Sequence, residues 1–559
     1  MRNLRRLALE ELVGDQDYSI KRLDDIIETI MQVFDGYMNS SNIYDKEEKD
    51  LSIESLERLS SKRIGAIAKD LGIIDSGFDF SAFSNKEFRM LIDTIETELD
   101  KHISEYLYKY SPELFITNMM FFASIISKVT MEANSEEEIE FDFNDKILSI
   151  ERTLQSIRKT GSQDIRTFLR EIKAATEYSI NYVLLGKFTM SDVSRTKKMD
   201  YLEILVLFNT KNYLFQLREL IPLLKDRRGE LSIDEEGIQI PNYFVDGFNK
   251  YAELTMNEKI RVENTLTNKL FEVFRKTMEF EPENIIKYIL SQDENRAVKI
   301  YNNFLSIVDK NLLRRDMMFN QILTFSGGNR IIECFTLNDK NFYKSKSATE
   351  LIESKNNRLF RAPIIEVEDK LILPTYSWLE STHYFSFRIL NRDINIKNID
   401  HHNWNELIKT TYDEYDIQEL KSLLEYHGYI AGKNWDLAQD KELKDSIESV
   451  KGMPHEIDLY YIKDNMLMIH DLKNYGMQFS FSDAKKLVDS VRIEKKKLRK
   501  LKKFIMDKKD FFERRLGFPF ADVSLGIITV DPTIYNFFVE KEDEVSVKSI
   551  TEFRKVLST

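Results

Sequence analysis

The scarcity of residues that turn a chain constrains this fold more than any other feature. The 559 residues include only 18 glycines and 9 prolines, about 5% of the chain against about 12% in an average protein. Because tight turns rely on these two residues, a mainly β protein is excluded. The sequence predicts a mainly helical chain of about three or four domains.

The chain divides into three regions. In residues 1–310 apolar residues recur at spacings of three and four, which predicts a large helical region for sensing, oligomerisation or partner docking, with a short hairpin at 230–241. Residues 311–400 form a mixed α+β connecting segment, in which a Gly327-Gly328 turn precedes the strand-like IIECFTL, and APIIEV and LILPTY form a hairpin. Residues 401–559 are expected to form an α/β domain with a mixed sheet flanked by helices.

Several features bear on compartment and on the classes of protein that are excluded. The single cysteine, Cys334, cannot form an internal disulfide, so we expect a buried structural thiol in a reducing compartment. The first residues lack the apolar core of a secretion signal, and the apolar run at 116–129 is too short and too polar to span a bilayer. No GxxxxGK[ST] motif occurs, and His401-His402 is interpreted as linker. We therefore expect a cytoplasmic protein without membrane contact.

The last 150 residues alternate helices and strands. The pattern predicts a helix at 412–427 that Gly428 ends, a short strand at 429–431, and strands at 456–462 and 466–473 joined by a turn at 463–465. A long helix at 482–507 and strands at 523–530 and 534–539 follow. The expected order is helix, three strands, helix, two strands.

Charged residues interrupt two of these apolar strands. Asp471 and Lys473 are two apart and share a face, while Leu472 faces the opposite layer. The hairpin register brings Glu456 or Asp458 opposite them. Such charges are costly unless they are paired or bind something. Carboxylates with phosphate oxygens satisfy Mg²⁺, which predicts phosphodiester hydrolysis; the alternative is an ordinary ion pair at a sheet edge.

These residues resemble the PD-(D/E)xK nuclease superfamily, which has the restriction-endonuclease-like fold. The matching pieces are Asp458 in HEIDLYYI and Asp471-Leu472-Lys473 in IHDLKN, in an α-β-β-β-α-β order, with Ile457 where the family name has proline. The resemblance implies that Asp458, Asp471 and the backbone carbonyl of Leu472 bind Mg²⁺, for which Mn²⁺ can substitute. It also implies that Lys473 is the catalytic lysine.

Accessory roles are assigned through the same resemblance. Many members carry a glutamate on the first helix, but the matching position here is Ile417. Glu419 or Glu414 could substitute for it. Further accessory candidates are Glu456, Gln478, which matches an accessory glutamine of some members, and His455, close enough to touch a phosphate. His470 is expected to be structural.

Basic charge is confined to one segment of an acidic protein. The net charge is −13, yet residues 485–515 contain fourteen Lys or Arg and five Asp or Glu, and so carry +9. A solvated helix face is the simpler interpretation, but the position beside the site favours contact with phosphates. The predicted nucleic-acid-binding residues are Lys485, Lys486, Arg492, Lys496, Lys497, Lys500 and Lys503.

Together these patterns predict a Mg²⁺-dependent endonuclease that acts on DNA. A role in bacterial antiviral defence follows from analogy at the level of the fold. We expect a homodimer, because paired sites are needed to cut both strands at once, and a protein partner for the helical region. The alternatives are a nucleic-acid-binding or scaffold protein whose nuclease-like domain is inactive, and an effector that cuts RNA.

Overall fold

The structure is a computed structural model that describes the chain in part. The described residues are 25–32 except 27 and 31, 56–74, 85–133, 162–185, 190, 199–224, 232–239, 251, 304–338 except 325–326, 358–383 except 368, 414–475, 481–538 and 544–558. The chain divides into two compact units: residues 1–215, 231–239 and 271–399 form unit 1, and residues 216–230, 240–270 and 400–559 form unit 2. Helices predominate, with mixed sheets, as the sequence predicted.

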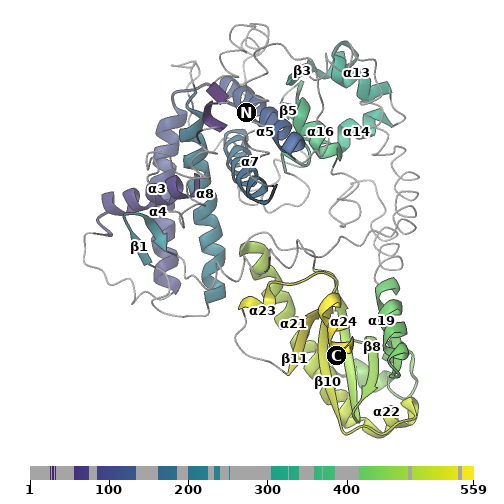
Figure 1. Ribbon diagram of the computed structural model, residues 1–559. Helices are drawn as coiled ribbons and strands as arrows, with labels where there is room; N and C mark the ends of the chain where they lie inside the picture. Colours follow the sequence, from purple (N-terminus) through teal and green to yellow (C-terminus); the bar gives the residue numbers. More distant parts are fainter. Residues whose placement is uncertain are drawn as a thin grey trace. The chain divides into compact units, whose positions relative to one another are not determined.

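Long helices dominate unit 1 (Figure 1). They are α3 (Leu56–Asp70), α4 (Asn85–Leu107), α5 (Pro112–Ala133), α7 (Ser162–Leu184) and most of α8 (Tyr201–Leu220), which the short helix η2 (Ile221–Leu224) follows. Helix α5 packs against α7 and α16. Within the described residues, Leu114–Met131 of α5 is the one stretch long and apolar enough to cross a membrane, and 89% of it is buried inside the structure. This burial is typical of a core helix.

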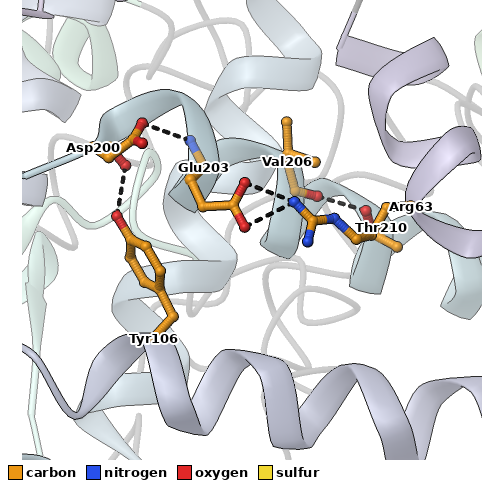
Figure 2. A network of polar contacts seen from close by, with 6 residues as sticks. All are labelled: Arg63, Tyr106, Asp200, Glu203, Val206 and Thr210. Atoms are coloured by element: carbon orange, nitrogen blue, oxygen red, sulfur yellow. Dashed lines mark hydrogen bonds and ion pairs between the residues drawn. The ribbon is translucent and has the colours of Figure 1, made fainter. Parts of the chain in front are cut away.

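A polar network fixes the start of α8 (Figure 2). The Asp200 carboxylate accepts the Glu203 backbone N–H at 3.0 Å, as a helix N-cap does, and the Asp200 carbonyl accepts the Tyr106 hydroxyl at 3.1 Å. Arg63 Nη2 donates to both Glu203 carboxylate oxygens, at 2.8 and 2.7 Å. Burial raises the pKa of Tyr106, so this hydroxyl stays a donor. The network ties α3, α4 and α8 together.

The hairpin predicted at 230–241 is confirmed as β1 (Ser232–Asp234) and β2 (Gly237–Gln239). It packs on α3, where a Cβ on Gly65 would lie 2.3 Å from the Glu235 carbonyl oxygen. A side chain at position 65 would therefore push the hairpin off the helix.

A four-stranded sheet completes unit 1. Its order is β3-β6-β5-β4, formed by β3 (Leu305–Asp309), β4 (Thr336–Leu337), β5 (Ile364–Val367) and β6 (Lys370–Pro374), with η3 (Lys310–Arg315), α13 (Met317–Thr324), α14 (Gly328–Cys334) and α16 (Thr375–His383) beside it. The predicted hairpin of APIIEV and LILPTY is confirmed, since β5 and β6 are antiparallel neighbours.

Two sequence predictions in this segment are wrong. The stretch IIEC is helical in α14, and the strand is confined to Thr336–Leu337. Gly327 has a φ of 76° where the chain turns, and a Cβ on Gly328 would lie 2.3 Å from the Ile322 carbonyl oxygen. This close approach of α14 to α13 overrides the strand preference of the isoleucines. Cys334 at the end of α14 is half-buried, whereas we expected it to be buried.

Unit 2 contains one five-stranded mixed sheet of order β11-β10-β9-β8-β7 (Figure 1). The strands are β7 (Ile430–Asp436), β8 (Glu456–Lys463), β9 (Met466–Lys473), β10 (Asp522–Thr529) and β11 (Val545–Ser549). The helices are α19 (Glu414–Tyr426), η5 (Leu437–Gln439), α20 (Lys444–Glu448), α21 (Phe481–Asp507), α22 (Lys509–Leu516), α23 (Tyr535–Phe538) and α24 (Ile550–Ser558). Neighbouring strands are antiparallel from β7 to β9 and parallel from β9 to β11.

Most of these elements were predicted from the sequence. Helices α19 and α21 and strands β7 to β10 are confirmed, and Gly428, with a φ of 82°, ends α19. The predicted strand at 534–539 is wrong, because 535–538 form the helical turn α23 and the fifth strand is β11. The Asn536 side chain donates to the Val547 carbonyl, and Tyr535 is buried under Lys495 of α21. Tertiary packing thus decides the conformation of this aromatic run.

The two faces of the sheet carry different side chains. Helices α19 and α24 cover one face through a core that contains Leu424, Leu459, Tyr461, Ile528 and Phe553, with Leu472 packed against it. Side chains alternate along a strand, so Asp458, Asp471 and Lys473 belong to the opposite face. Helix α21 packs against β10. The charged residues of β8 and β9 therefore lie on the sheet face away from the α19–α24 core.

Candidate functional site

A two-residue turn sets the register of β8 and β9. Asp464 and Asn465 both have positive φ, 49° and 60°, which is the conformation of a type I′ hairpin turn. Asp and Asn tolerate it better than most residues. The turn pairs Lys463 with Met466, and the ladder then runs to Leu459 and His470. In this register Asp458 is level with Asp471, which is one of the pairings that the sequence left open.

The backbone pairing of β8 with β9 ends at Leu459 and His470, and beyond it a side chain takes the place of a backbone acceptor. The Leu472 N–H donates to Asp458 Oδ2 at 2.8 Å rather than to a carbonyl of β8. The N–H and C=O of one strand residue point to the same side, so the Leu472 carbonyl also faces the side of Asp458. On the other side, β9 continues in register with β10 as far as Lys473 and Thr529.

Lys473 and Asp471 are brought together as expected. Lys473 Nζ donates to Asp471 Oδ1 at 2.8 Å, and the side chains are 32% and 13% exposed. Residues at this depth keep access to solvent while most of their hydration is removed. The structure therefore gathers Asp458, Asp471, Lys473 and the Leu472 backbone at one sheet position.

This group contains two carboxylates and one ammonium, and burial and these charges shift the pKa values of Asp458 and Lys473. Burial, followed by the charge of Asp471 and a hydrogen bond with it, raises the pKa of Asp458 to about 7. The Leu472 N–H and the Lys473 charge oppose that shift. Burial alone would lower the pKa of Lys473, but the charges of Asp471, Asp458 and Glu494 outweigh it and raise that pKa. Two close carboxylates with one ammonium favour an added cation.

The donor set fits a divalent cation that prefers oxygen. The described residues contain no group of three or more His, Cys, Asp and Glu side chains that could hold a metal ion. A metal at this position would therefore have two carboxylate ligands, and its other ligands would be backbone oxygen, water or substrate. Asp458 and Asp471 with the Leu472 carbonyl supply oxygen ligands only, which suits Mg²⁺, an ion that keeps several waters and binds substrate phosphates. Soft metals that select sulfur or imidazole are disfavoured by this set.

Two residues that sequence reasoning missed interact electrostatically with this group. Glu494, on α21, acts electrostatically on both Lys473 and Tyr475. Tyr475 follows β9, and its buried hydroxyl has no hydrogen-bond partner among the described residues. Burial, then the charges of Glu494 and Asp471, raise the pKa of this hydroxyl. The signal in the sequence was the helical periodicity of α21, which places Glu494 on the same face as the buried Val491 and Leu498.

The structure places the accessory candidates in different surroundings. Glu419 accepts from Arg554 of α24, on the other face of the sheet, and the buried Ile417 occupies the position of the family glutamate. Glu456 lies on β8 opposite Asp436 of β7, and His455 is exposed. Gln478 and the Glu414 side chain lie outside what the structure describes.

His470 is structural, as predicted. It is 6% exposed, stacks on Tyr461 at 5.6 Å and meets Phe553 at 5.1 Å between ring centroids. Burial, then the charge of Lys548, lower its pKa to about 3, so the ring is neutral. Its side chain belongs to the face opposite Asp471.

The predicted nucleic-acid-binding residues differ in their exposure and in their ion-pair partners. Lys485 pairs with Glu219, Arg492 with Asp489 at 3.4 Å, and Lys497 with Glu494 at 2.8 Å. The exposed members are Lys486, Arg492, Lys496, Lys500 and Lys503. The last four follow one another at spacings of four, four and three, and so form one stripe on α21, which we call the basic stripe.

Comparison with protein-family models, with curated proteins and with solved structures finds no match to this chain. The resemblance to the PD-(D/E)xK nucleases therefore rests on the residues themselves and on the strands that carry them.

Proposed function

We propose that the protein is a Mg²⁺-dependent endonuclease whose C-terminal unit hydrolyses phosphodiester bonds in DNA, as the PD-(D/E)xK resemblance implies. The observation that carries the proposal is the meeting of Asp458, Asp471 and Lys473 at the end of the β8–β9 ladder. A half-buried Asp458 whose pKa is raised to about 7 beside a second carboxylate is costly without a ligand, and a cation bound there offsets that cost.

Each residue has a role in this proposal. Asp458 and Asp471 would hold Mg²⁺ with the Leu472 carbonyl, and the ion, when bound, would lower the pKa of a water and neutralise phosphate charge. The Leu472 N–H fixes the Asp458 carboxylate through Oδ2. The Lys473 ammonium, held by Asp471, is available to orient that water and to stabilise charge on the phosphate oxygens.

Substrate contact would come from the basic stripe of Arg492, Lys496, Lys500 and Lys503 on α21. The rest of the chain is acidic, so a polyanion would be attracted at this segment. A homodimer would present two sites to the two strands, and the helical unit 1 would receive a protein partner. Antiviral defence in the cytoplasm is the setting that the fold-level analogy suggests.

The test is digestion of supercoiled plasmid and of RNA with Mg²⁺, Mn²⁺ or EDTA, using wild type, Asp458→Ala, Asp471→Ala and Lys473→Ala. We expect metal-dependent DNA cleavage by the wild type only, with DNA binding retained by the variants. Glu442→Ala, which removes an exposed carboxylate of the same unit, is the control. Equal cleavage by wild type and the three site variants would reject the assignment.

The same experiment separates the alternatives. Cleavage of RNA with intact plasmid would make the protein an RNA-cutting effector. DNA binding without cleavage under any metal would make it a nucleic-acid-binding scaffold with an inactive nuclease-like domain. Both outcomes would overturn the proposed DNA endonuclease.

A further inference from the structure

Two aromatic side chains lie beside the candidate site, on the same face of the sheet. Tyr460 comes two residues after Asp458 on β8, so the two side chains belong to one face. The Trp435 ring of β7 lies 5.3 Å from the Tyr460 ring, measured between centroids, and both residues are half-buried. Because β7 is the last strand in the order of this sheet, the ring pair lies at a sheet edge and keeps access to solvent.

The backbone of β7 is irregular just before Trp435. Lys433 and Trp435 are paired with β8, but the pairing skips Asn434, which has a φ of 49°. A positive φ inside a strand is unusual for a residue other than glycine, and such conformations cluster at functional sites. In a regular strand Trp435 would share the face of its partner Ile457, away from Tyr460. The left-handed Asn434 therefore turns the Trp435 ring toward the face of the candidate site.

Two further residues hold the ring pair in place. A Cβ on Gly432 would lie 2.1 Å from Tyr460 Cζ, so the absence of a side chain there lets the Tyr460 ring lie across β7. Phe512 of α22, which is fully buried, contacts Trp435 with 5.3 Å between the ring centroids. The local backbone and packing thus position two rings that stay partly open to solvent.

Positive charge lies near the start of β8 and near Tyr460. Lys500 of the basic stripe donates to the Lys451 carbonyl at 2.7 Å, in the turn that precedes β8. Burial raises the pKa of the Tyr460 hydroxyl, and the charges of Arg515 and Lys421 oppose that rise. The Arg515 side chain is 66% exposed. Phosphates that flank a base on the ring pair would therefore meet cations here.

A solvent-accessible ring pair is suited to stacking on a nucleobase. Proteins that bind single strands stack bases on aromatic side chains, with little preference for sequence. In a duplex the neighbouring bases cover both faces of each base, so an aromatic side chain reaches only a base that has left the stack. The rings therefore indicate which form of nucleic acid fits the site.

We propose that Trp435 and Tyr460 form a stacking platform for an unpaired base next to the candidate site, and that the substrate is single-stranded DNA or a strand that has left its duplex. The inference rests on the proposed function. The base that follows the phosphate held at Asp458 and Asp471 would lie on the platform, and Arg515 would contact a neighbouring phosphate. Base identity would matter little, because every base offers a π-face.

The first test measures binding without cleavage, by fluorescence anisotropy in EDTA and with Ca²⁺ in place of Mg²⁺. The ligands are oligodeoxythymidylate of about 12 nucleotides, within the usual size of a single-strand site, an abasic strand with the same phosphates, and the duplex with oligodeoxyadenylate. We expect Tyr460→Leu to weaken thymidylate binding at least about fivefold, the size of one base–aromatic stack, and to leave the other two ligands within about twofold. Tyr460→Phe, which keeps the ring, and Tyr426→Leu, which removes a tyrosine 86% exposed at the end of α19, should bind like wild type.

A second measurement tests Trp435 directly. Binding of the thymidylate strand should quench the tryptophan fluorescence of the wild type, because a base stacked on the indole quenches it. Trp435→Phe, in which Trp378 and Trp404 remain, should lose most of this quenching. Equal quenching in the two proteins would overturn the stacking on Trp435.

The outcomes separate this inference from the proposed function. Unchanged thymidylate binding by Tyr460→Leu, or an equal loss for the abasic strand, would reject the platform even if the wild type cuts plasmid DNA. A wild type that binds the duplex more tightly than the single strand would reject the unpaired substrate. Ring-dependent binding by a chain that cuts no nucleic acid would uphold the platform and reject only the nuclease.

Discussion

Buried carboxylates in the two units are compensated in different ways. In unit 1, the fully buried Glu177 carboxylate accepts from Arg358 at 2.9 and 3.1 Å and from the Leu359 N–H at 2.7 Å. In unit 2, Asp458 meets a second carboxylate, Asp471, with one ammonium for the two. A buried charge matched by an opposite charge needs nothing more, whereas a like-charged pair retains a cost that a ligand can remove. The contrast separates a structural charge from one that we propose binds a ligand.

The largest expected effects are on cleavage rate and on metal binding in variants of Asp471 and Lys473. Asp471→Asn should lose at least about 10²-fold in cleavage rate and also lose the rise in Tm that Mg²⁺ gives the wild type, because it removes a ligand. Lys473→Met should lose a similar factor in rate and keep the Mg²⁺-dependent rise in Tm. Thermal unfolding with and without Mg²⁺ checks both. An equal Mg²⁺ effect in wild type and Asp471→Asn would remove Asp471 from the metal site.

The structural carboxylate should affect stability and leave activity alone. Glu177→Ala should lower the free energy of unfolding by about 3 kcal/mol, because Arg358 and the Leu359 N–H lose their partner. Glu236→Ala breaks the exposed pair with Arg58, at 3.6 Å, and should cost less than about 1 kcal/mol. Urea unfolding measures both changes. Equal costs would show that the burial of Glu177 carries no special stabilisation.

Asp458 should have the opposite effect on stability. The folded-state pKa of Asp458, about 7, lies above its ordinary 3.8, so folded protein keeps a proton that the unfolded chain releases. The stability this proton contributes is complete below about pH 4 and is lost as the pH rises through 7. In EDTA, wild type should lose on the order of 2 kcal/mol between pH 5 and 8 relative to Asp458→Asn. Parallel Tm–pH curves for the two proteins would contradict the shift.

The smallest expected effect concerns the basic stripe. Lys496→Ala with Lys500→Ala should reduce the slope of log K against log salt by about 1.8 if each lysine neutralises one phosphate of duplex DNA. The exposed Lys441, just before α20, and Lys444, its first residue, give a control double variant with the same charge change. Fluorescence anisotropy across a salt series measures both slopes. An unchanged slope in the stripe variant would exclude the stripe from the binding surface.

Local patterns in the sequence were enough to predict most of the candidate site. Alternation along a strand placed Asp471 and Lys473 on one face, and a turn of residues that accept positive φ brought Asp458 level with Asp471. These features depend on residues within about fifteen positions of one another, where backbone geometry leaves few choices. The stripe on α21 follows from helical spacing in the same way.

Other features depended on packing between distant segments. Glu419 is drawn to Arg554, the run at 535–538 becomes helical against α21, and Gly328 lets α14 form where strand-forming residues stand. Periodicity determined which face each side chain occupies. Which faces meet was decided by the close packing of helices on the sheet, because that depends on the shapes of many side chains at once.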